Sequence, residues 1–398
     1  MLTRKTTTLG LAMLIGGAGM TAAAPALANP EFKLRGRMHL DAALWDEDNV
    51  PLNDSVFFRR TRIGVTGKID DVWSGIIEYD FAENGSSAND VMINRKLGDG
   101  TLKIGQFKVP MGLNELTSSN SILFIERATP SNLVADARRI GIGYDWFKGD
   151  LGFQVMGFGR AIGSSQNGDT PLGLGGRFVY APKLGDDSFF HFGVSAAYED
   201  RRDDSTARYR DRPEARPGGG VRLIDTGNIA DVDTTMKYGI ELAYQTGPFS
   251  VEAEYLNVDV NRDAGEEPSF GGYYVQASYV LTGEKRGYRN GVFRGVTPGQ
   301  AGRGAWELAA RFSSADLIDS GFQGGEQDNL TLGLNYYASA NVRFMLNYIF
   351  IDVSDSAAVA NGVTVGSDKP NVLLAARSST SRARMPALRR IAAPGSPS

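Results

Sequence analysis

Three arginines lie within four positions of the stretch "FFRRTRIGVTG" at residues 57–67, namely Arg59, Arg60 and Arg62. A guanidinium group stays charged at every physiological pH, and it binds oxyanions through two parallel hydrogen bonds. The second half of the same stretch alternates apolar and polar residues, as a half-buried strand does. Arginines gathered on such a strand predict that the protein interacts with small anions.

The residue types that catalysis needs are scarce. There is no cysteine, and the two histidines are His39 and His191. No G-x-S-x-G, H-E-x-x-H or phosphate-loop motif occurs. We therefore expect no enzymatic activity, no cofactor and no metal centre. An outer-membrane enzyme acting on lipids is a less favoured alternative, because it needs a lipid-facing nucleophile with a histidine, whereas alternation places His39 on the lumen side and His191 has no obvious partner serine.

The first 28 residues have the features of a secretory signal. A basic start at Arg4 and Lys5 is followed by an apolar stretch and by small residues that end in "ALA" before Asn29. The apolar stretch is too short to cross a bilayer as a helix. We expect cleavage after Ala28 and export. The formal net charge of −4 gives no electrostatic reason to bind nucleic acid.

Strict alternation of apolar and polar residues recurs along the rest of the chain. In "NLTLGLNYY" (329–337) and "VRFMLNYIF" (342–350), the apolar and aromatic residues fall on one face and mainly polar residues on the other. Runs of 9–11 such residues between polar turns are typical of strands in a transmembrane β-barrel. A soluble sandwich also alternates, but the export signal and the aromatic residues near strand ends favour the membrane barrel.

About sixteen strands are predicted, so the fold class is all-β, a transmembrane antiparallel β-barrel that encloses water. An even number of strands places both termini in the periplasm. The predicted spans are 33–44, 56–67, 72–82, 88–97, 101–107, 139–147, 150–160, 172–181, 188–199, 236–246, 248–259, 271–282, 303–313, 327–338, 341–352 and a last one from Asn371.

The alternation also predicts where the arginines point. If the apolar residues of 57–67 face lipid, Arg60 and Arg62 face the lumen, next to Arg35 and Arg37 of the first strand. Strict alternation points Arg59 outward. Either Arg59 lies at the outer rim, where exposure to lipid costs little, or a β-bulge turns it inward.

Three long connections interrupt the strand pattern. Residues 108–138 contain the apolar run "SILFIE", so we expect this external loop to fold into the lumen. Residues 201–222 include "RYRDR", whose Arg208, Arg210 and Arg212 share one side if the chain is extended. They are either a ladder that passes anions inward or a solvated surface loop. Residues 283–302 are long for a periplasmic turn.

These features together resemble the phosphate-selective porin O/P family. The pair "GYYVQASYVLTGEKRGYRNG" (272–291) and "GAWELAARFS" (304–313) is similar to two sequence blocks of that family. "FFRRTR" resembles its arginine strand, and "LKIGQFKVPMGLNELTSSNSILFIER" (102–127) resembles its third-loop segment. The resemblance covers roughly residues 33–375. It implies a trimeric sixteen-stranded barrel with inward-folded loops and an arginine-lined path to a central anion site.

The resemblance also implies roles for individual residues. By motif position the candidate anion-binding residues are Arg37, Arg59, Arg60, Asp90 and Arg127, and the "RYRDR" arginines match the family's ladder segment. Members specific for phosphate carry lysines that flank "TSS" in the third loop, where this chain has Glu115 and Asn120. Their lysine is also missing from "DDVWSG" (70–75). A weaker and broader anion preference is therefore expected.

The end of the chain departs from the family, whose members finish on a strand with a terminal aromatic residue. Residues 377–398 contain five arginines, no acid and no aromatic residue. We therefore expect a signal peptide at 1–28, a barrel domain at 29–376 and a disordered tail at 377–398.

The resulting hypothesis is an outer-membrane porin surrounded by lipid. Its arginines would favour inorganic phosphate, pyrophosphate, polyphosphate or other small anions. A general porin with balanced lumen charge is the main alternative, and a structural or adhesive barrel is a further one.

Overall fold

The computed structural model describes residues 30–384, except 83–84, 166, 217–219 and 301. The predicted signal at 1–28 lies outside these residues. No helix within the described ranges is long and apolar enough to cross a membrane.

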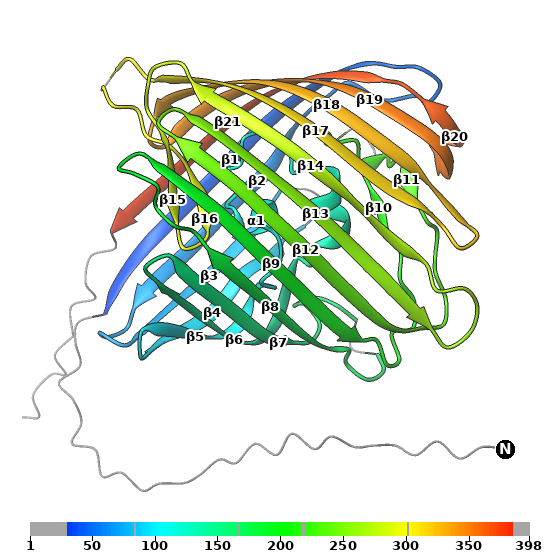
Figure 1. Cartoon of the computed structure of the whole chain (residues 1–398), viewed down its shortest axis with the longest axis horizontal. Coiled ribbons are helices and arrows are strands. Elements are labelled where there is room, and N and C mark those ends of the chain that lie inside the picture. Colours follow the sequence, from blue (N-terminus) through cyan, green and yellow to red (C-terminus); the bar gives the residue numbers. More distant parts are fainter. Residues whose placement is uncertain (1–29, 83–84, 166, 217–219, 301, 385–398) are drawn as a thin grey trace, which may run out of the picture.

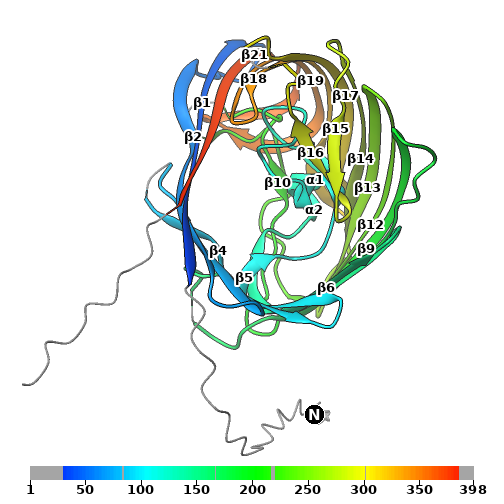
Figure 2. The ribbon, with the colours of Figure 1, turned by 90° about the vertical axis from the view of Figure 1, so that its left-hand side faces the viewer.

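The described chain forms one large antiparallel sheet that closes on itself, and sixteen of its strands make up the barrel wall (Figures 1 and 2). This confirms the predicted fold class. Each wall strand pairs with the next one along the chain, and the last pairs with the first. The wall strands are β1 (Glu31–Asp46), β2 (Ser55–Lys68), β3 (Trp73–Asp80), β4 (Ser87–Leu97), β5 (Gly100–Lys108), β6 (Arg138–Lys148), β7 (Leu151–Phe158), β8 (Leu172–Tyr180), β9 (Ser188–Asp200), β12 (Val232–Thr246), β13 (Phe249–Arg262), β14 (Ser269–Val280), β17 (Ala305–Asp319), β18 (Phe322–Ser339), β19 (Val342–Ala360) and β21 (Asn371–Arg384).

The barrel closes through β21, which pairs with β1 from Asn371 opposite Asp46 to Arg384 opposite Lys33. The barrel therefore extends past Ala376, and residues 377–384 are a strand where we expected disorder. Backbone hydrogen bonds do not require an aromatic end. Arg377 of this segment is exposed outward and lies beside Phe344 near the start of β19, where exposure to lipid costs little. Residues 385–398 lie outside the described part.

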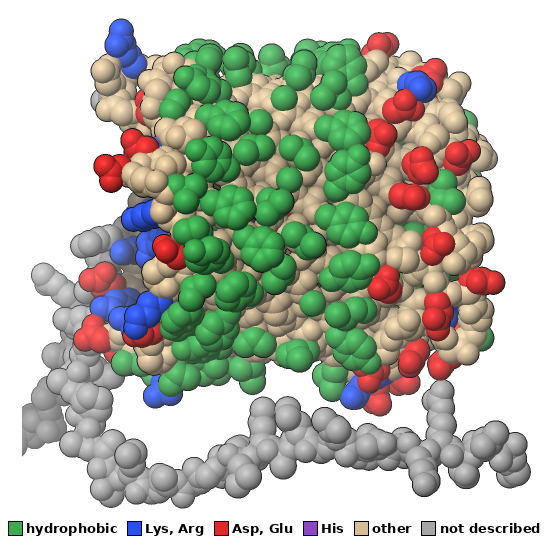
Figure 3. All heavy atoms as spheres, viewed as in Figure 1, with side chains coloured by type: hydrophobic (Ala, Val, Ile, Leu, Met, Phe, Trp, Pro, Cys, Tyr) green, Lys and Arg blue, Asp and Glu red, His purple; other side chains and the backbone are tan. Residues whose placement is uncertain are grey.

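The side chains follow the two-residue period of the strands. On β18, Leu330 and Leu332 are exposed outward, whereas Asn329 and Thr331 are fully buried inside. A band of hydrophobic side chains covers the middle of the outer surface (Figure 3). At one edge of the band the rings of Trp306 and Tyr336 stack with centroids 4.5 Å apart, as expected where a barrel meets the lipid headgroups.

The two ends of the barrel differ in charge and in loop length. The described termini of β1 and β21 lie at the end with mostly short turns, which is the periplasmic end. Acidic side chains gather at the opposite, outer end (Figure 3). There Asp316 is the cross-strand partner of Glu326, and Asp328 is that of Asp352. The short β20 (Val363–Asp368) pairs with β19 at this end.

The third external loop, residues 109–137, folds into the lumen as predicted (Figure 2). It carries α1 (Leu113–Leu116) and α2 (Thr129–Val134). Its buried apolar run is held by polar side chains of the inner wall, because backbone groups away from water need partners. Asn347 accepts from the amide of Ile125, Asn335 donates to the carbonyl of Leu123, and Arg343 donates to that of Ile122.

The fifth external loop, residues 201–231, also reaches inward. Its short strands β10 (Arg210–Asp211) and β11 (Ile224–Asp225) pair with each other. Glu214 of this loop is buried and accepts hydrogen bonds from the Thr129 amide at 2.9 Å and from the Ser313 hydroxyl at 2.6 Å. It also forms an ion pair with Arg311 on β17. One acid thus fixes the fifth loop to the third loop and to the wall.

The long periplasmic connection forms a hairpin inside the barrel, with strands β15 (Arg286–Arg289) and β16 (Val292–Val296) (Figure 2). Its Asn290–Gly291 turn has positive φ at both residues, which suits a two-residue hairpin. Arg177 of β8 donates to the carbonyl of Gly291 at 2.8 Å. Arg286 donates to the carbonyl of Ser121 at 3.1 Å, so the hairpin meets the third loop.

Shortening β21 tests whether residues 377–384 close the barrel. A chain that ends at Ala376 leaves β1 from Lys33 to Leu40 without its partner, and each unpaired backbone group costs several kcal/mol in hydrocarbon. We expect this chain to lose the mobility difference between heated and unheated samples in gel electrophoresis. A chain that ends at Arg384 is the matched control and should keep it. Equal mobility shifts for both chains would contradict this account of closure.

Candidate functional site

A cavity of about 410 Å³ lies inside the barrel and is lined by the first strands, the third loop and the β15–β16 hairpin. Nine basic and four acidic side chains line it. The basic ones are Arg35, Arg37, Arg60, Arg62, Lys103, Lys108, Arg127, Arg138 and Arg294, and the acidic ones are Glu78, Asp90, Glu115 and Asp145. An enclosed surface with such an excess of positive charge attracts anions.

Arg59 points inward because of a β-bulge. The register between β1 and β2 pairs His39 with Arg60 and then Leu40 with Phe58, so Arg59 is the extra residue. Phe58 is exposed outward, whereas Arg59 and Arg60 are both buried inside. A bulge of this kind re-aims a side chain. It resolves the two readings that alternation left open for Arg59.

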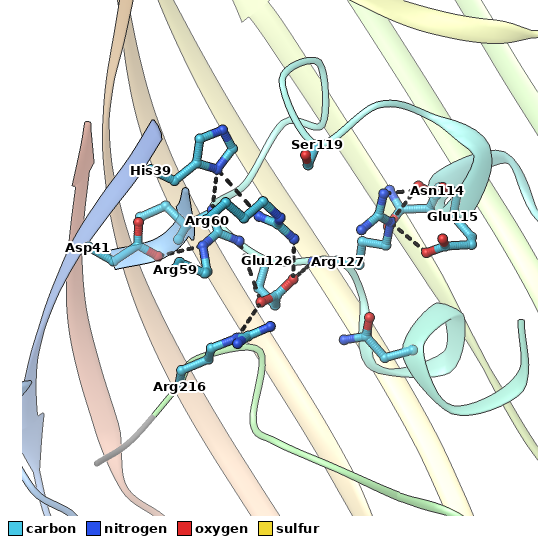
Figure 4. Close-up of polar contacts among 12 residues, drawn as sticks. His39, Asp41, Arg59, Arg60, Asn114, Glu115, Ser119, Glu126, Arg127 and Arg216 are labelled. Atoms are coloured by element: carbon cyan, nitrogen blue, oxygen red, sulfur yellow. Dashed lines mark hydrogen bonds and ion pairs between the residues drawn. The ribbon is translucent and has the colours of Figure 1, made fainter. Parts of the chain in front are cut away.

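Three arginines converge on one carboxylate of the third loop (Figure 4). The side chain of Glu126 lies 3.4 Å from Arg59 Nη1, 3.8 Å from Arg60 Nη2 and 3.5 Å from Arg216 Nε. Arg59 also contacts Asp41 at 2.6 Å through Nε.

The charge state of this cluster follows from its surroundings. Burial alone raises the pKa of Glu126, but Arg59 and Arg60 outweigh it and hold the pKa below its usual range. Burial and Arg59 lower the pKa of Arg216 to about 10. At neutral pH the acid is therefore ionised and the arginine is charged.

Arg127 is bound mainly to its own loop (Figure 4). Its guanidinium donates to the carbonyls of Asn114 at 3.0 Å and Thr117 at 2.9 Å, and it lies 2.9 Å from the carboxylate of Glu115. Glu115 also lies 2.8 Å from Lys108. Burial raises the pKa of Glu115, but the opposite effect of Arg127 and Lys108 is larger. The pKa therefore lies below its usual value, and this acid stays ionised. Two cations of the cavity thus share one counter-charge.

Other predicted site residues are also paired with opposite charge. Arg62 lies 2.7 Å from Asp80 and 3.5 Å from Glu78. Asp90 forms a 2.7 Å ion pair with Arg138. These pairs reduce the net charge that each arginine presents to a solute.

Unpaired positive charge lies toward the periplasmic end. Arg37 donates to the hydroxyl of Ser119 at 2.8 Å. Within the described ranges, no carboxylate lies within 4 Å of Arg35, Arg37, Arg294 or Arg382. A second cavity, of about 530 Å³, is lined by five arginines and one acid. Those side chains are Arg35, Arg37, Arg294, Arg343, Arg382 and Glu78.

The "RYRDR" arginines lie at the outer approach and do not line either cavity. Arg208 and Arg210 are exposed on one side of the segment, and the intervening Tyr209 is buried. Both arginines face Asp225, at 2.7 Å for Arg208 and 3.8 Å for Arg210. Arg212 is half-buried.

Sequence analysis did not identify some of the residues that line the cavity. Lys103 could have been predicted to face the lumen, because it alternates with the outward residues Leu102 and Ile104 of β5. Arg294 could not, because nothing in the sequence indicated that a periplasmic connection enters the lumen. Arg216, which contacts Glu126, lies in a segment with no strand pattern.

Comparison with known proteins supports the same fold and class. Residues 32–376 match the family described as phosphate-selective porin O and P. An uncharacterised protein of Caulobacter vibrioides is 31% identical over 83% of this chain and 70% of its own length. Porin O of Pseudomonas aeruginosa is 28% identical over 80% of this chain and 82% of its own length.

Solved structures share the fold at low sequence identity. An anion-selective porin from Comamonas acidovorans has a TM-score of 0.55 at 14% identity, covering 88% of this chain and 100% of its own. The trimer form of OmpT, an outer membrane protein of Vibrio cholerae, has a TM-score of 0.56 at 10% identity, covering 89% and 100%. With the family pattern matched across nearly the whole barrel, this chain belongs to the phosphate-selective porin O and P family and is a channel-forming porin of the outer membrane.

Proposed function

We propose that this porin passes small hydrophilic solutes along an arginine-lined path that favours anions such as phosphate, pyrophosphate or polyphosphate. The observation that carries this proposal is the excess of basic over acidic side chains around the 410 Å³ cavity. The family description, which names phosphate selectivity, supports the same solute class.

The path has three stages. The exposed Arg208 and Arg210 collect anions at the outer approach. The cavity beside Arg60 and Arg127 holds them in the middle of the barrel. The arginine-rich second cavity then draws them toward the periplasm. Conduction requires each stage to bind weakly enough for release.

Ion pairing makes the anion preference moderate. Glu115 neutralises part of the charge of Lys108 and Arg127, and Asp90 does the same for Arg138. These pairs favour weak, broad recognition over tight binding of one anion. They are also the observation that favours the alternative, a general porin with balanced lumen charge.

The assembly is proposed to be a homotrimer embedded in outer-membrane lipid, as the trimer form of the similar OmpT suggests. Transport is passive, since the path depends on electrostatic attraction and diffusion alone.

A bilayer recording of the purified full-length protein in a KCl gradient, followed by addition of phosphate, tests the proposal. A reversal potential on the anion side together with block of the chloride current by phosphate is expected. A reversal potential near zero or on the cation side, without block by phosphate, would favour the general porin.

The first prediction concerns Arg60, which lines the cavity. Arg60→Ala removes one charge and leaves Glu126 less compensated, so both changes disfavour anions. We expect the chloride-to-potassium permeability ratio to fall about tenfold, because one charge about 12 Å away at an effective dielectric constant of about 40 changes the energy of each ion by about 0.7 kcal/mol, in opposite directions for chloride and potassium. Lys148→Ala, at an exposed periplasmic turn, removes the same charge away from the cavity and should leave the ratio unchanged. An unaltered ratio in Arg60→Ala would take Arg60 out of the path.

The second prediction concerns Glu115. Glu115→Gln keeps the shape of the side chain and releases the charges of Lys108 and Arg127. We expect phosphate to block the chloride current about tenfold more tightly, which corresponds to about 1.4 kcal/mol. Asp99→Asn is the matched control, because Asp99 is an exposed acid that pairs with Lys148 away from the cavity, and it should leave the block by phosphate unchanged. Block no tighter than in the wild type would mean that Glu115 does not limit anion binding.

A further inference from the structure

Glu126 occupies the position that an anion would take among three guanidinium groups. Arg59 and Arg60 come from the wall strand β2, and Arg216 comes from the fifth loop (Figure 4). The acid itself comes from the third loop. Elements far apart in the sequence thus meet around one carboxylate.

The spacing of this cluster is wider than one carboxylate requires. The three nitrogen–oxygen distances to Glu126 are 3.4, 3.8 and 3.5 Å, whereas charge-assisted hydrogen bonds of this type measure about 2.7–2.9 Å. Arg59 reaches Asp41 at 2.6 Å in the same cluster. The arginines therefore surround Glu126 at longer distances than the contact between Arg59 and Asp41.

The carboxylate and the main chain of Glu126 are held by different contacts. The carbonyl of Glu126 accepts a 3.1 Å hydrogen bond from Arg311, which fixes the main chain. The side chain accepts a 3.2 Å bond from the amide of Arg127 in addition to the arginine contacts. Rotation of this side chain does not require the third loop to move.

Access to the cluster leads through Arg60, which contacts Glu126 on one side and lines the 410 Å³ cavity on the other. An anion in the cavity and the Glu126 carboxylate therefore act on the same guanidinium group. When an anion in the cavity attracts the guanidinium group of Arg60, the contact between Arg60 and Glu126 weakens.

We propose that Glu126 is a tethered counter-anion that competes with permeating oxyanions for Arg59, Arg60 and Arg216, and so determines which anions bind. A chloride ion offers one charge and cannot displace the carboxylate. Phosphate or pyrophosphate carries more charge and more oxygens, so it gains enough from three guanidinium groups to take the place of Glu126. The inference rests on the proposed anion path. Within that path, Glu126 would distinguish anions of higher charge from chloride.

The test uses full-length protein carrying Glu126→Gln, which removes the charge and keeps the size of the side chain. The half-blocking concentrations of phosphate and pyrophosphate are measured on the chloride current of single channels. We expect both to fall about tenfold, while the chloride conductance rises by no more than about threefold, the effect of one removed negative charge on a monovalent anion. Asp136→Asn is the matched control, because Asp136 is a buried, ion-paired acid of the same loop that contacts Lys237 and Arg139 and does not line the cavity. Its half-blocking concentrations should equal those of the wild type.

A purely structural role for Glu126, as a link between the third and fifth loops, predicts a different result. In that case Glu126→Gln lowers the thermal stability of the folded barrel and leaves the phosphate block unchanged. Such an outcome, in a wild-type channel that still reverses on the anion side, would overturn the inference and leave the proposed function intact. A wild-type channel without anion preference would instead overturn the proposed function.

Glu126→Asp covers the case in which Glu126→Gln does not fold. It keeps the charge but withdraws the carboxylate by one methylene from the arginines. We expect a decrease of about threefold in the half-blocking concentration of phosphate. Unchanged block in the folded Glu126→Asp channel would equally overturn the inference.

Discussion

The structure depends on one constraint, the need of every backbone N–H and C=O group in hydrocarbon to find a partner within the protein. The pairing of β21 with β1 completes that ladder and removes the last free edge of the sheet. Once the sheet is closed, side chains must alternate between lipid and lumen. The lumen then becomes the one place inside the membrane where arginines and acids are accommodated together.

Closure also explains why so many lumen charges are paired. A charge in a narrow interior is less well solvated than at an open surface, so each arginine gains from a nearby acid. Arg62 has Asp80, Arg138 has Asp90, and Arg127 has Glu115. The pairs stabilise the inward loops and at the same time lower the attraction for solutes. Structural stability and anion preference therefore use the same side chains and limit each other.

Much of the fold was predictable because the period of two is imposed by the bilayer on every strand. The predicted spans match the observed wall strands to within a few residues over β1 to β9, and the outer ends of β17 to β19 run further than expected. The inward third loop was also predictable, since an apolar run such as 121–126 needs a surface to pack on. The start of the last strand at Asn371 was predictable as well, but its continuation past Ala376 was not, because Ser378 and Thr380 carry no apolar pattern and their place in the sheet depends on pairing with the neighbouring strands.

The site was less predictable than the fold. Alternation applied to Arg60 and Arg62 but not to Arg59, because a bulge adds one residue to β2. The acidic partners of the arginines could not be predicted, since Glu126 is separated from Arg59 by 67 residues and contacts it only in the folded lumen. The entry of the β15–β16 hairpin depends on tertiary contacts such as that between Arg177 and Gly291.

The uneven distribution of charge along the barrel has an electrical consequence. Acidic side chains such as Asp316 and Asp328 gather at the outer end, while Arg294 and Arg382 line the cavity toward the periplasm. An ion entering from one side therefore meets a different potential from an ion entering from the other. We therefore expect the channel to rectify, so that its current at a given voltage depends on polarity and its orientation in a bilayer can be read from that asymmetry. Salt that screens the outer acids makes the two directions more alike.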